Sequence, residues 1–267
     1  MVSAPNIADH CPVIETKNLS VSFGGHLAVS DVSCCFEEGT LTAIVGPNGA
    51  GKTTYFNLIS GQLKSTSGHV FLNGEEITQY PVARRAQCGI GRAFQLTNLF
   101  PELTVQENIR LAVQSMAKTR DSFLTLWSSH TELIEKADHF LELAGLGQYA
   151  KANASTLSHG NQRKLEVAIL MALEPRVYMF DEPTAGMSVD EVPIVLDLIK
   201  RVKSEGNKTI LLVEHKLDVI RSLADRIVVL NNGEVVADGD PTTVMASDIV
   251  REAYLGRARQ DRVGAAK

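Results

Sequence analysis

A phosphate-binding pattern lies near the start of the chain, between an apolar segment and a helix-forming one. It has the form G-x-x-x-x-G-K-T, from Gly46 to Thr53, and it follows the apolar residues Leu41 to Val45. The glycines let backbone N–H groups turn toward one anion, the N-terminus of the following helix adds partial positive charge, and Lys52 adds a full charge. The hydroxyl of Thr53 is a suitable ligand for Mg²⁺. The spacing therefore predicts a site for the phosphates of a nucleoside triphosphate and disfavours a plain glycine-rich turn.

Two adjacent carboxylates follow another apolar run. Val177 to Phe180 has the composition of a central parallel strand, which would deliver Asp181 and Glu182 at its C-terminal end. Asp181 could hold Mg²⁺ through water, and Glu182 could orient or deprotonate a water molecule. The alternative is an acidic pair that begins a helix before Pro183. The phosphate-binding loop favours the catalytic interpretation.

Four other residues are ambiguous when each is taken alone. Gln95 ends an apolar, strand-like piece, and a solvated or capping amide is its ordinary interpretation. Ser158 is placed to cap a helix. His215 follows the apolar residues Thr209 to Val213, which should form a strand beside the carboxylate strand. Phe23 is either a core aromatic or an exposed ring that stacks on a base, and the sequence leaves both open.

The elements that must position these residues follow from the apolar patterns. We expect antiparallel strands over residues 14–36 with a turn at Gly24-Gly25, and a short helix after Thr53 that stops at Gly61. Helices are expected over much of 102–147 and over 189–205. The helix that begins at Ser158 should bury one stripe, formed by Leu165, Ala168, Ile169, Ala172 and Leu173. A strand and turn at 69–74 and a hairpin over 227–237 complete the pattern, and the segment 117–130 could be a short helix or a loop.

Composition and charge narrow the class of protein. The chain has 267 residues, 44% of them hydrophobic, and a net charge of −5, which argues against a main role in coating nucleic acid. Its four cysteines show no CxxC spacing, so we expect reduced thiols and no metal site built from them. The N-terminus does not resemble a signal peptide. No apolar run reaches the length of a membrane helix, so another chain must span any membrane that this one serves.

The order of these motifs resembles the nucleotide-binding subunit of an ABC transporter. It combines the phosphate-binding loop, Gln95, the signature Leu157-Ser158-His159-Gly160-Asn161, the two carboxylates and His215. The resemblance covers Ile14 to Gly256, with a helical subdomain at about 102–175 and flexible tails at 1–13 and 257–267. It implies an α/β fold, in which a P-loop NTPase core with a mainly parallel sheet carries an antiparallel β-subdomain and a helical subdomain.

The same resemblance implies a role for each residue. Phe23 would stack on adenine, Glu182 would act as general base, and His215 would contact the γ-phosphate. Thr53, Gln95 and Asp181 would arrange Mg²⁺, while Ser158 and the Gly160 amide would bind the ATP of the opposite subunit. The implied nucleotide-binding residues are Phe23, Gly46, Pro47, Asn48, Gly49, Ala50, Gly51, Lys52, Thr53, Thr54, Ser158, His159, Gly160 and Asn161, and the implied catalytic residues are Lys52, Gln95, Glu182 and His215.

The implied partners are a second ATPase subunit, identical or paralogous, two membrane-spanning permease subunits and, indirectly, a solute-binding protein, with no nucleic acid. The chain would then lie at the cytoplasmic face of the inner membrane and pass motion to the permeases near Leu96 to Pro101. The signature departs from its commoner form at His159 and Asn161, where glycine and glutamine are usual. The motifs around Leu165-Glu166, Gly186-Met187 and Tyr254-Leu255 resemble ATPases of branched-chain amino-acid importers, with urea importers as the near alternative.

Two other function classes account for less of the sequence. A soluble ABC-type ATPase that acts on ribosomes or DNA would usually join two ATPase halves or insert long coiled coils, and this chain shows neither. A P-loop kinase would leave Ser158, Gly160 and His215 unexplained. The importer ATPase therefore accounts for more of the sequence than either rival.

Overall fold

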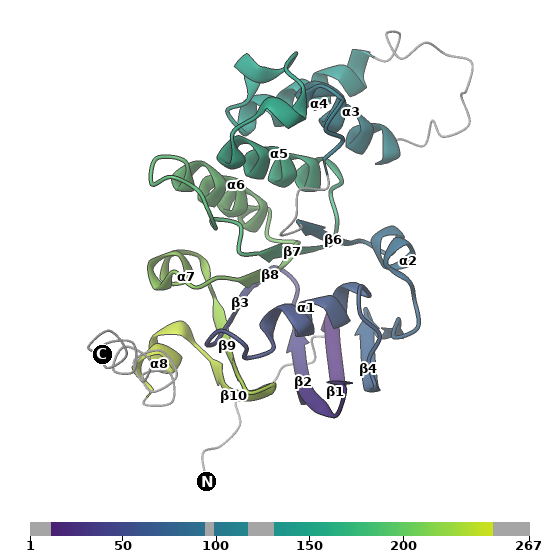
Figure 1. The fold of residues 1–267 in the computed structure, drawn as a ribbon, viewed down its shortest axis with the longest axis vertical. Helices are drawn as coiled ribbons and strands as arrows, with labels where there is room; N and C mark the ends of the chain where they lie inside the picture. Colours follow the sequence, from purple (N-terminus) through teal and green to yellow (C-terminus); the bar gives the residue numbers. More distant parts are fainter. Residues whose placement is uncertain (1–11, 94–98, 117–130, 248–267) are drawn as a thin grey trace. The chain divides into compact units, whose positions relative to one another are not determined.

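A computed structural model describes residues 12–93, 99–116 and 131–247. Gln95, the segment 117–130 and the basic tail after Gly256 lie outside these residues, and so do the predictions made for them. The chain divides into two compact units, residues 1–85 with 224–267 and residues 86–223. The chain first passes from one unit to the other within helix α2 (Val82–Gln87). Each unit is described by itself below (Figure 1).

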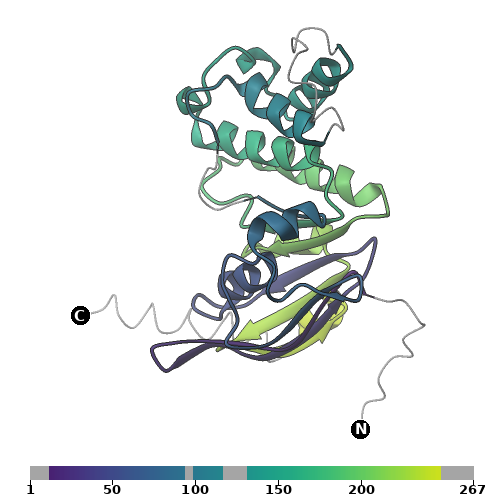
Figure 2. The same cartoon turned by 90° about the vertical axis from the view of Figure 1, so that its right-hand side faces the viewer.

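The first unit contains an antiparallel sheet with the strand order β2-β1-β4-β5. The long strands β1 (Ile14–Phe23) and β2 (His26–Phe36) form the expected hairpin with its turn at Gly24-Gly25. Strands β4 (Ser67–Leu72) and β5 (Glu75–Glu76) extend the sheet from β1. Figure 2 shows the purple hairpin beside the yellow strands from the C-terminal part of this unit.

A parallel pair in the first unit carries the phosphate-binding loop. Strand β3 (Leu41–Val45) is buried at every residue and pairs in parallel with β9 (Arg226–Asn231). Strand β10 (Glu234–Gly239) returns antiparallel to β9, as the sequence predicted. Helix α1 (Lys52–Ser60) follows β3 and ends at Gly61, as expected, and α8 (Pro241–Ala246) follows β10.

In the second unit, three parallel strands hold the carboxylates and the histidine. Strand β7 (Val177–Asp181) pairs with β6 (Ile90–Ala93) on one side and with β8 (Thr209–Val213) on the other. The sequence predicted that the strand before Asp181 and the strand before His215 would be neighbours, and the pairing of β7 with β8 confirms this. Helices α6 (Val192–Ser204) and α7 (Leu217–Leu223) alternate with these strands along the chain.

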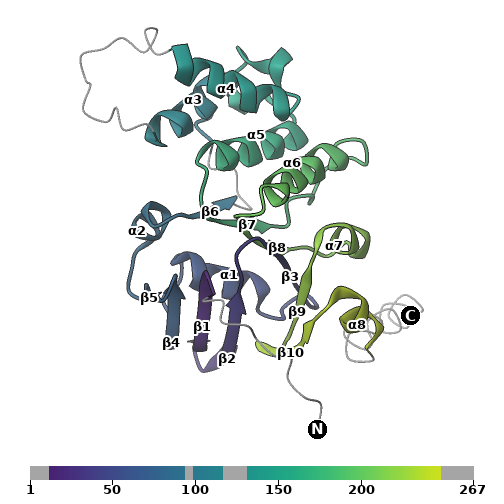
Figure 3. The same cartoon turned by 180° about the vertical axis from the view of Figure 1, so that it is seen from behind.

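The helices of the second unit gather around α5 (His159–Ala172), which contacts α3 (Val105–Met116), α4 (Thr131–Leu143) and α6 (Figure 3). Short 3-10 turns at Gly147–Tyr149 and Ala154–Thr156 lead into α5. The prediction of a single buried stripe was wrong. Ile169 and Leu173 are only half-buried, whereas the charged residues Arg163, Lys164 and Glu166 are buried, because neighbouring helices cover α5 on several sides.

Candidate functional site

The phosphate-binding loop has the backbone that its glycines predict. Gly46 has φ +153°, and a Cβ there would lie 2.1 Å from the carbonyl oxygen of Leu230. Gly51 has φ +97° and precedes the first turn of α1. No residue with a side chain could take either conformation without displacing backbone. Buried strand, glycine turn and helix start therefore occur in the order that anion binding requires.

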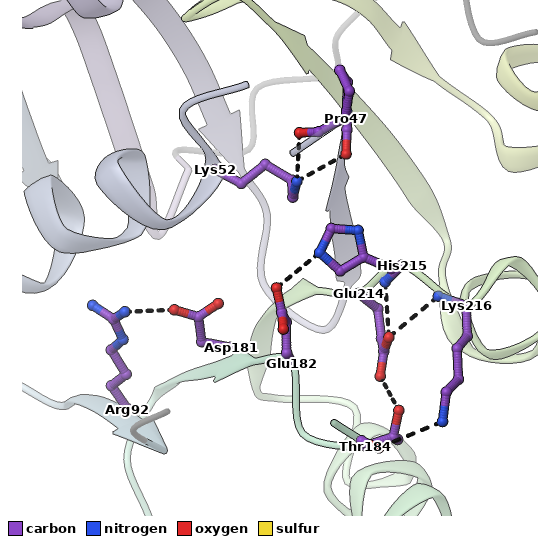
Figure 4. A network of polar contacts seen from close by, with 10 residues as sticks. Pro47, Lys52, Arg92, Asp181, Glu182, Thr184, Glu214, His215 and Lys216 are labelled. Carbon is purple, nitrogen blue, oxygen red and sulfur yellow. Dashed lines mark hydrogen bonds and ion pairs between the residues drawn. The ribbon is translucent and has the colours of Figure 1, made fainter. Parts of the chain in front are cut away.

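Lys52 lies inside this loop and is only 6% exposed. Its ammonium group donates hydrogen bonds to the carbonyl oxygens of Gly46 at 2.8 Å and Pro47 at 3.0 Å (Figure 4). These bonds hold the cation against the loop that turns around it, which a solvent-exposed lysine would not do. Thr53 and Thr54 follow in the first turn of α1 and are both half-buried.

Phe23 is an exposed ring and no part of the core. It ends β1 directly before the Gly24-Gly25 turn, and 50% of its surface is accessible. Of the two interpretations that the sequence left open, the structure favours the one in which the ring can stack on another planar group.

Glu182 and His215 face each other at the ends of two paired strands. Asp181 and Val213 are register partners in β7 and β8, and the N–H of Glu182 donates to the Val213 carbonyl at 2.9 Å. The carboxylate of Glu182 then lies 2.8 Å from Nε2 of His215 (Figure 4). Glu182 has φ +50°, a left-handed conformation that costs a residue with a side chain about 1 kcal/mol or more. Such strain is typical of a residue whose side chain must point in a required direction.

Asp181 forms a buried ion pair with a residue that the sequence analysis did not single out. Nη2 of Arg92, on the neighbouring strand β6, lies 2.7 Å from Oδ2 of Asp181, and both side chains are at most 5% exposed. Burial lowers the pKa of the Arg92 guanidinium, and the negative charge of Asp181 opposes this effect. The sequence signal that could have identified Arg92 is that it is the single charged residue of β6, a strand that is otherwise apolar. Because Arg92 holds one oxygen of Asp181, this carboxylate has a fixed orientation.

The signature residues begin α5. The hydroxyl of Ser158 accepts a hydrogen bond from the Asn161 N–H at 3.3 Å, so Ser158 is the helix cap that the sequence predicted. The Asn161 side chain in turn accepts from Lys164 at 3.0 Å. His159 is exposed, and its ring lies close to Gly186, where a Cβ would be 3.1 Å from it. The uncommon residues at 159 and 161 therefore leave the helix start regular.

Gly160 lies against the side chain of Glu191, a contact that the sequence did not reveal. A Cβ at this position would lie 2.1 Å from a carboxylate oxygen of Glu191. Glu191 is held there by the N–H and the hydroxyl of Ser188, at 3.2 and 3.0 Å, and Lys164 lies 3.8 Å away. The first turn of α5 is thus linked to the segment that follows the two carboxylates.

Comparison with known proteins identifies the family of this chain. The ABC transporter family profile matches residues 29–185. The chain belongs to the ABC transporter family. It is 40% identical, over 92% of its length and 99% of the relative, to the high-affinity branched-chain amino acid transport ATP-binding protein BraF of Pseudomonas aeruginosa. It is 36% identical to LivG of Escherichia coli, which has the same description, over 92% of this chain and 99% of LivG.

Solved structures confirm the α/β cassette fold. A nucleotide-free ATP-binding cassette from an ABC transporter matches with a TM-score of 0.77 and 29% identity, over 91% of this chain and 98% of that one. A dimeric bacterial ABC transporter cassette matches with a TM-score of 0.75 and 27% identity, over 85% of this chain and 98% of that one. The chain is therefore an ATPase subunit of this family and binds adenine nucleotide. Among the described residues, no helix is long and apolar enough to cross a membrane.

Proposed function

We propose that this ATPase hydrolyses ATP to power an importer of branched-chain or other amino acids. The observation that carries hydrolysis is the 2.8 Å contact between Glu182 and His215, which places a candidate general base beside a histidine. The import of amino acids is supported by the similarity to BraF and LivG over 92% of the chain. Urea or short amides are the alternative solutes.

The proposed roles follow from the chemistry of each side chain. Lys52 and the backbone N–H groups of residues 48–54 hold the phosphates of ATP, since a buried ammonium beside a glycine turn is a strong anion site. The exposed ring of Phe23 stacks on adenine. Glu182 accepts a proton from the attacking water, and His215 orients Glu182 and contacts the γ-phosphate. Gln95, which lies outside the described residues, is proposed to orient the same water.

The oxygen donors of this chain fit Mg²⁺. The buried Asp181 carboxylate is held in one orientation by Arg92, and Thr53 places a hydroxyl in the first turn of α1. Mg²⁺ bound with phosphates needs few protein ligands and prefers oxygen, so Thr53, Asp181 and Gln95 are the proposed set. When bound, the ion would neutralise charge on the phosphates.

We propose that two ATPase subunits, identical or paralogous, work together on a pair of permease subunits at the cytoplasmic face of the membrane. Ser158 and Gly160 would bind the γ-phosphate held by the opposite subunit, because they form the N-terminus of a helix of 14 residues. Phe100 is 57% exposed, and the adjacent Leu99 lines a cavity of about 130 Å³. This apolar pair supports permease docking near residues 96–101. The ATPase domain would span Ile14 to Gly256, with its helical subdomain at about 102–175.

An uptake experiment tests the proposal. Cells in which the chromosomal copy carries Lys52→Ala should lose most uptake of labelled leucine, whereas uptake of labelled urea stays normal. Loss of urea uptake alone would instead assign the alternative solute. The tagged wild-type protein should also purify from detergent-solubilised membranes together with a multi-span partner. Its recovery with ribosomes, with no membrane partner, would contradict the importer assignment.

A further inference from the structure

The carboxylate of Glu214 is buried beneath the two loops that carry Glu182 and His215. Glu214 follows β8 directly and is only 3% exposed. One of its oxygens accepts a hydrogen bond from the hydroxyl of Thr184, which is also buried. The other oxygen accepts from the backbone N–H groups of His215 at 2.8 Å and Lys216 at 3.3 Å (Figure 4).

These contacts suit a carboxylate. A deprotonated Glu has two acceptor oxygens and no donor, so it can receive the hydroxyl on one side and both N–H groups on the other. The amide of Gln has one oxygen for the two N–H groups, and its NH₂ group could bond to Thr184 only if the hydroxyl turned to accept, so the direction of that bond would reverse and the negative charge would be lost. Burying a carboxylate is costly unless it is well hydrogen-bonded, and the ammonium of Lys216, which donates to the Thr184 carbonyl at 3.4 Å, adds a nearby positive charge.

The position of these partners joins the two strand ends. Thr184 lies two residues after Glu182, and His215 follows Glu214 directly. The pair Glu214 and Thr184 therefore makes a second side-chain link between the same two loops that the pair Glu182 and His215 joins at 2.8 Å. Two links between two loops fix both their separation and their relative rotation, which a single contact cannot do.

We infer that Glu214 is a positioning residue for ATP hydrolysis: its buried carboxylate holds the His215 loop against Thr184 and so keeps the imidazole directed at Glu182. The inference rests on the roles proposed above for Glu182 and His215. Glu214 itself touches no reacting group. It acts through the backbone of His215 on one side and through Thr184 on the other.

The first test is Glu214→Gln in the full-length ATPase. Because the amide is neutral and meets Thr184 through a reversed hydrogen bond, its hold on the His215 loop should weaken. The loop should then shift, and kcat should fall by about 10- to 100-fold, as expected for a small misplacement of a catalytic group. The KM for ATP should stay within about twofold, since Lys52 and its loop are unchanged. The control is Glu205→Gln, a carboxylate of the same unit that is 51% exposed, which should match the wild type in both constants.

A second test uses the other end of the link. Thr184→Val removes the hydroxyl at nearly constant volume and should lower kcat as Glu214→Gln does, whereas Thr184→Ser keeps the hydroxyl and should restore at least half of the activity. The double variant Glu214→Gln/Thr184→Val should be no slower than the slower single variant, because both changes act on the same link. Additive losses would show that the two residues act separately and would overturn the inference.

A spectroscopic readout separates positioning from general damage. The ¹⁵N signals of the His215 imidazole, identified by their loss in His215→Ala, should move in Glu214→Gln and stay in place in Glu205→Gln. Unchanged His215 signals or wild-type kcat in a folded Glu214→Gln variant would overturn the inference. Failure of the proposed function looks different: Glu182→Gln would then hydrolyse ATP normally, while the imidazole signals would still report whether Glu214 holds His215.

Discussion

Replacing Glu182 by Gln should nearly stop ATP hydrolysis and leave ATP binding intact. The amide occupies the same volume, and either end of it can form a hydrogen bond with Nε2 of His215, now 2.8 Å from the carboxylate. What the substitution removes is the ability to accept a proton. General base catalysis contributes about 10²- to 10⁴-fold, which corresponds to about 2.7 to 5.4 kcal/mol of activation free energy.

The assay is steady-state phosphate release, together with size-exclusion chromatography in the presence of Mg²⁺-ATP. We expect kcat to fall by about 10³-fold, with the melting temperature within about 2 °C of the wild type, because no buried contact is removed. If two ATPase subunits enclose ATP, the variant should accumulate as a dimer with ATP and remain a monomer with ADP.

The control for this variant is Glu174→Gln, which alters a solvent-exposed carboxylate of the same unit and should leave kcat unchanged. A turnover number within threefold of the wild type in Glu182→Gln would refute the base role of Glu182. Lost turnover together with lost ATP binding would refute it equally, because it would show that the carboxylate serves the ground state and not the chemical step.

Four further predictions concern other parts of the chain. Lys52→Ala should weaken ATP binding by about 100-fold in a fluorescent-nucleotide titration, since it removes the buried cation of the phosphate loop; a change below tenfold would contradict its role. Arg85→Met should lower the free energy of unfolding, measured by urea denaturation, by about 3 kcal/mol. The reason is that the buried guanidinium donates to backbone carbonyls at the end of α1 and before α2. A loss under 1 kcal/mol would argue against this anchoring. Gly160→Ala should displace the Glu191 carboxylate, which would otherwise lie 2.1 Å from the new methyl group. It should also weaken ATP-driven dimerisation at least tenfold, as measured by analytical ultracentrifugation. An unchanged dimer dissociation constant would exclude Gly160 from contact with the ATP of the opposite subunit. Burial raises the pKa of the Cys34 thiol to about 11 from 9.0. The native state therefore favours the neutral thiol, and this contribution to the free energy of unfolding should be lost as the pH rises from about 9 to 11. Alkylation of Cys34 at pH 8 should require unfolding, and rapid labelling of the native protein would show that the thiol is accessible.

The sequence predicted most of the strands because their residues are buried on both faces. The runs Leu41 to Val45, Val177 to Phe180 and Thr209 to Val213 are predominantly apolar, and each forms a strand that is buried at every residue. The turn at Gly24-Gly25 was equally clear, because the glycines take positive φ angles that other residues avoid. Such signals are local, so they can be read without knowledge of the fold.

Elements that depend on neighbours were predicted less well. Helix α5 was expected to expose one side, yet Arg163 and Glu166 are buried and form an ion pair at 2.9 Å. Periodicity reports which residues are apolar, but it does not report which helices pack around them. Helix α6 was expected from Val189 and begins at Val192, because Ser188 and Glu191 first form a hydrogen-bonded turn.

In the candidate site, too, local patterns could be predicted from the sequence, whereas contacts between elements could not. The motifs supplied the residues that are proposed to meet the nucleotide, since phosphate chemistry fixes their type and spacing. They did not identify Arg92 or Glu214, because ion pairs and hydrogen bonds between strand ends depend on strand pairing. Nor did they predict the positive φ of Glu182, a backbone conformation that no residue type signals reliably except glycine.

Each charged group of the proposed machinery already has a partner within its own unit. Lys52 donates to its own loop, Asp181 pairs with Arg92, and Glu182 meets His215. We expect nucleotide binding to replace part of these internal contacts, so its net gain is the difference between the interactions formed and the interactions lost. That difference is small compared with either set, which favours reversible binding and release of ATP. A cycle that repeatedly closes and opens requires such a balance, and the internal partners supply it without leaving a buried charge uncompensated.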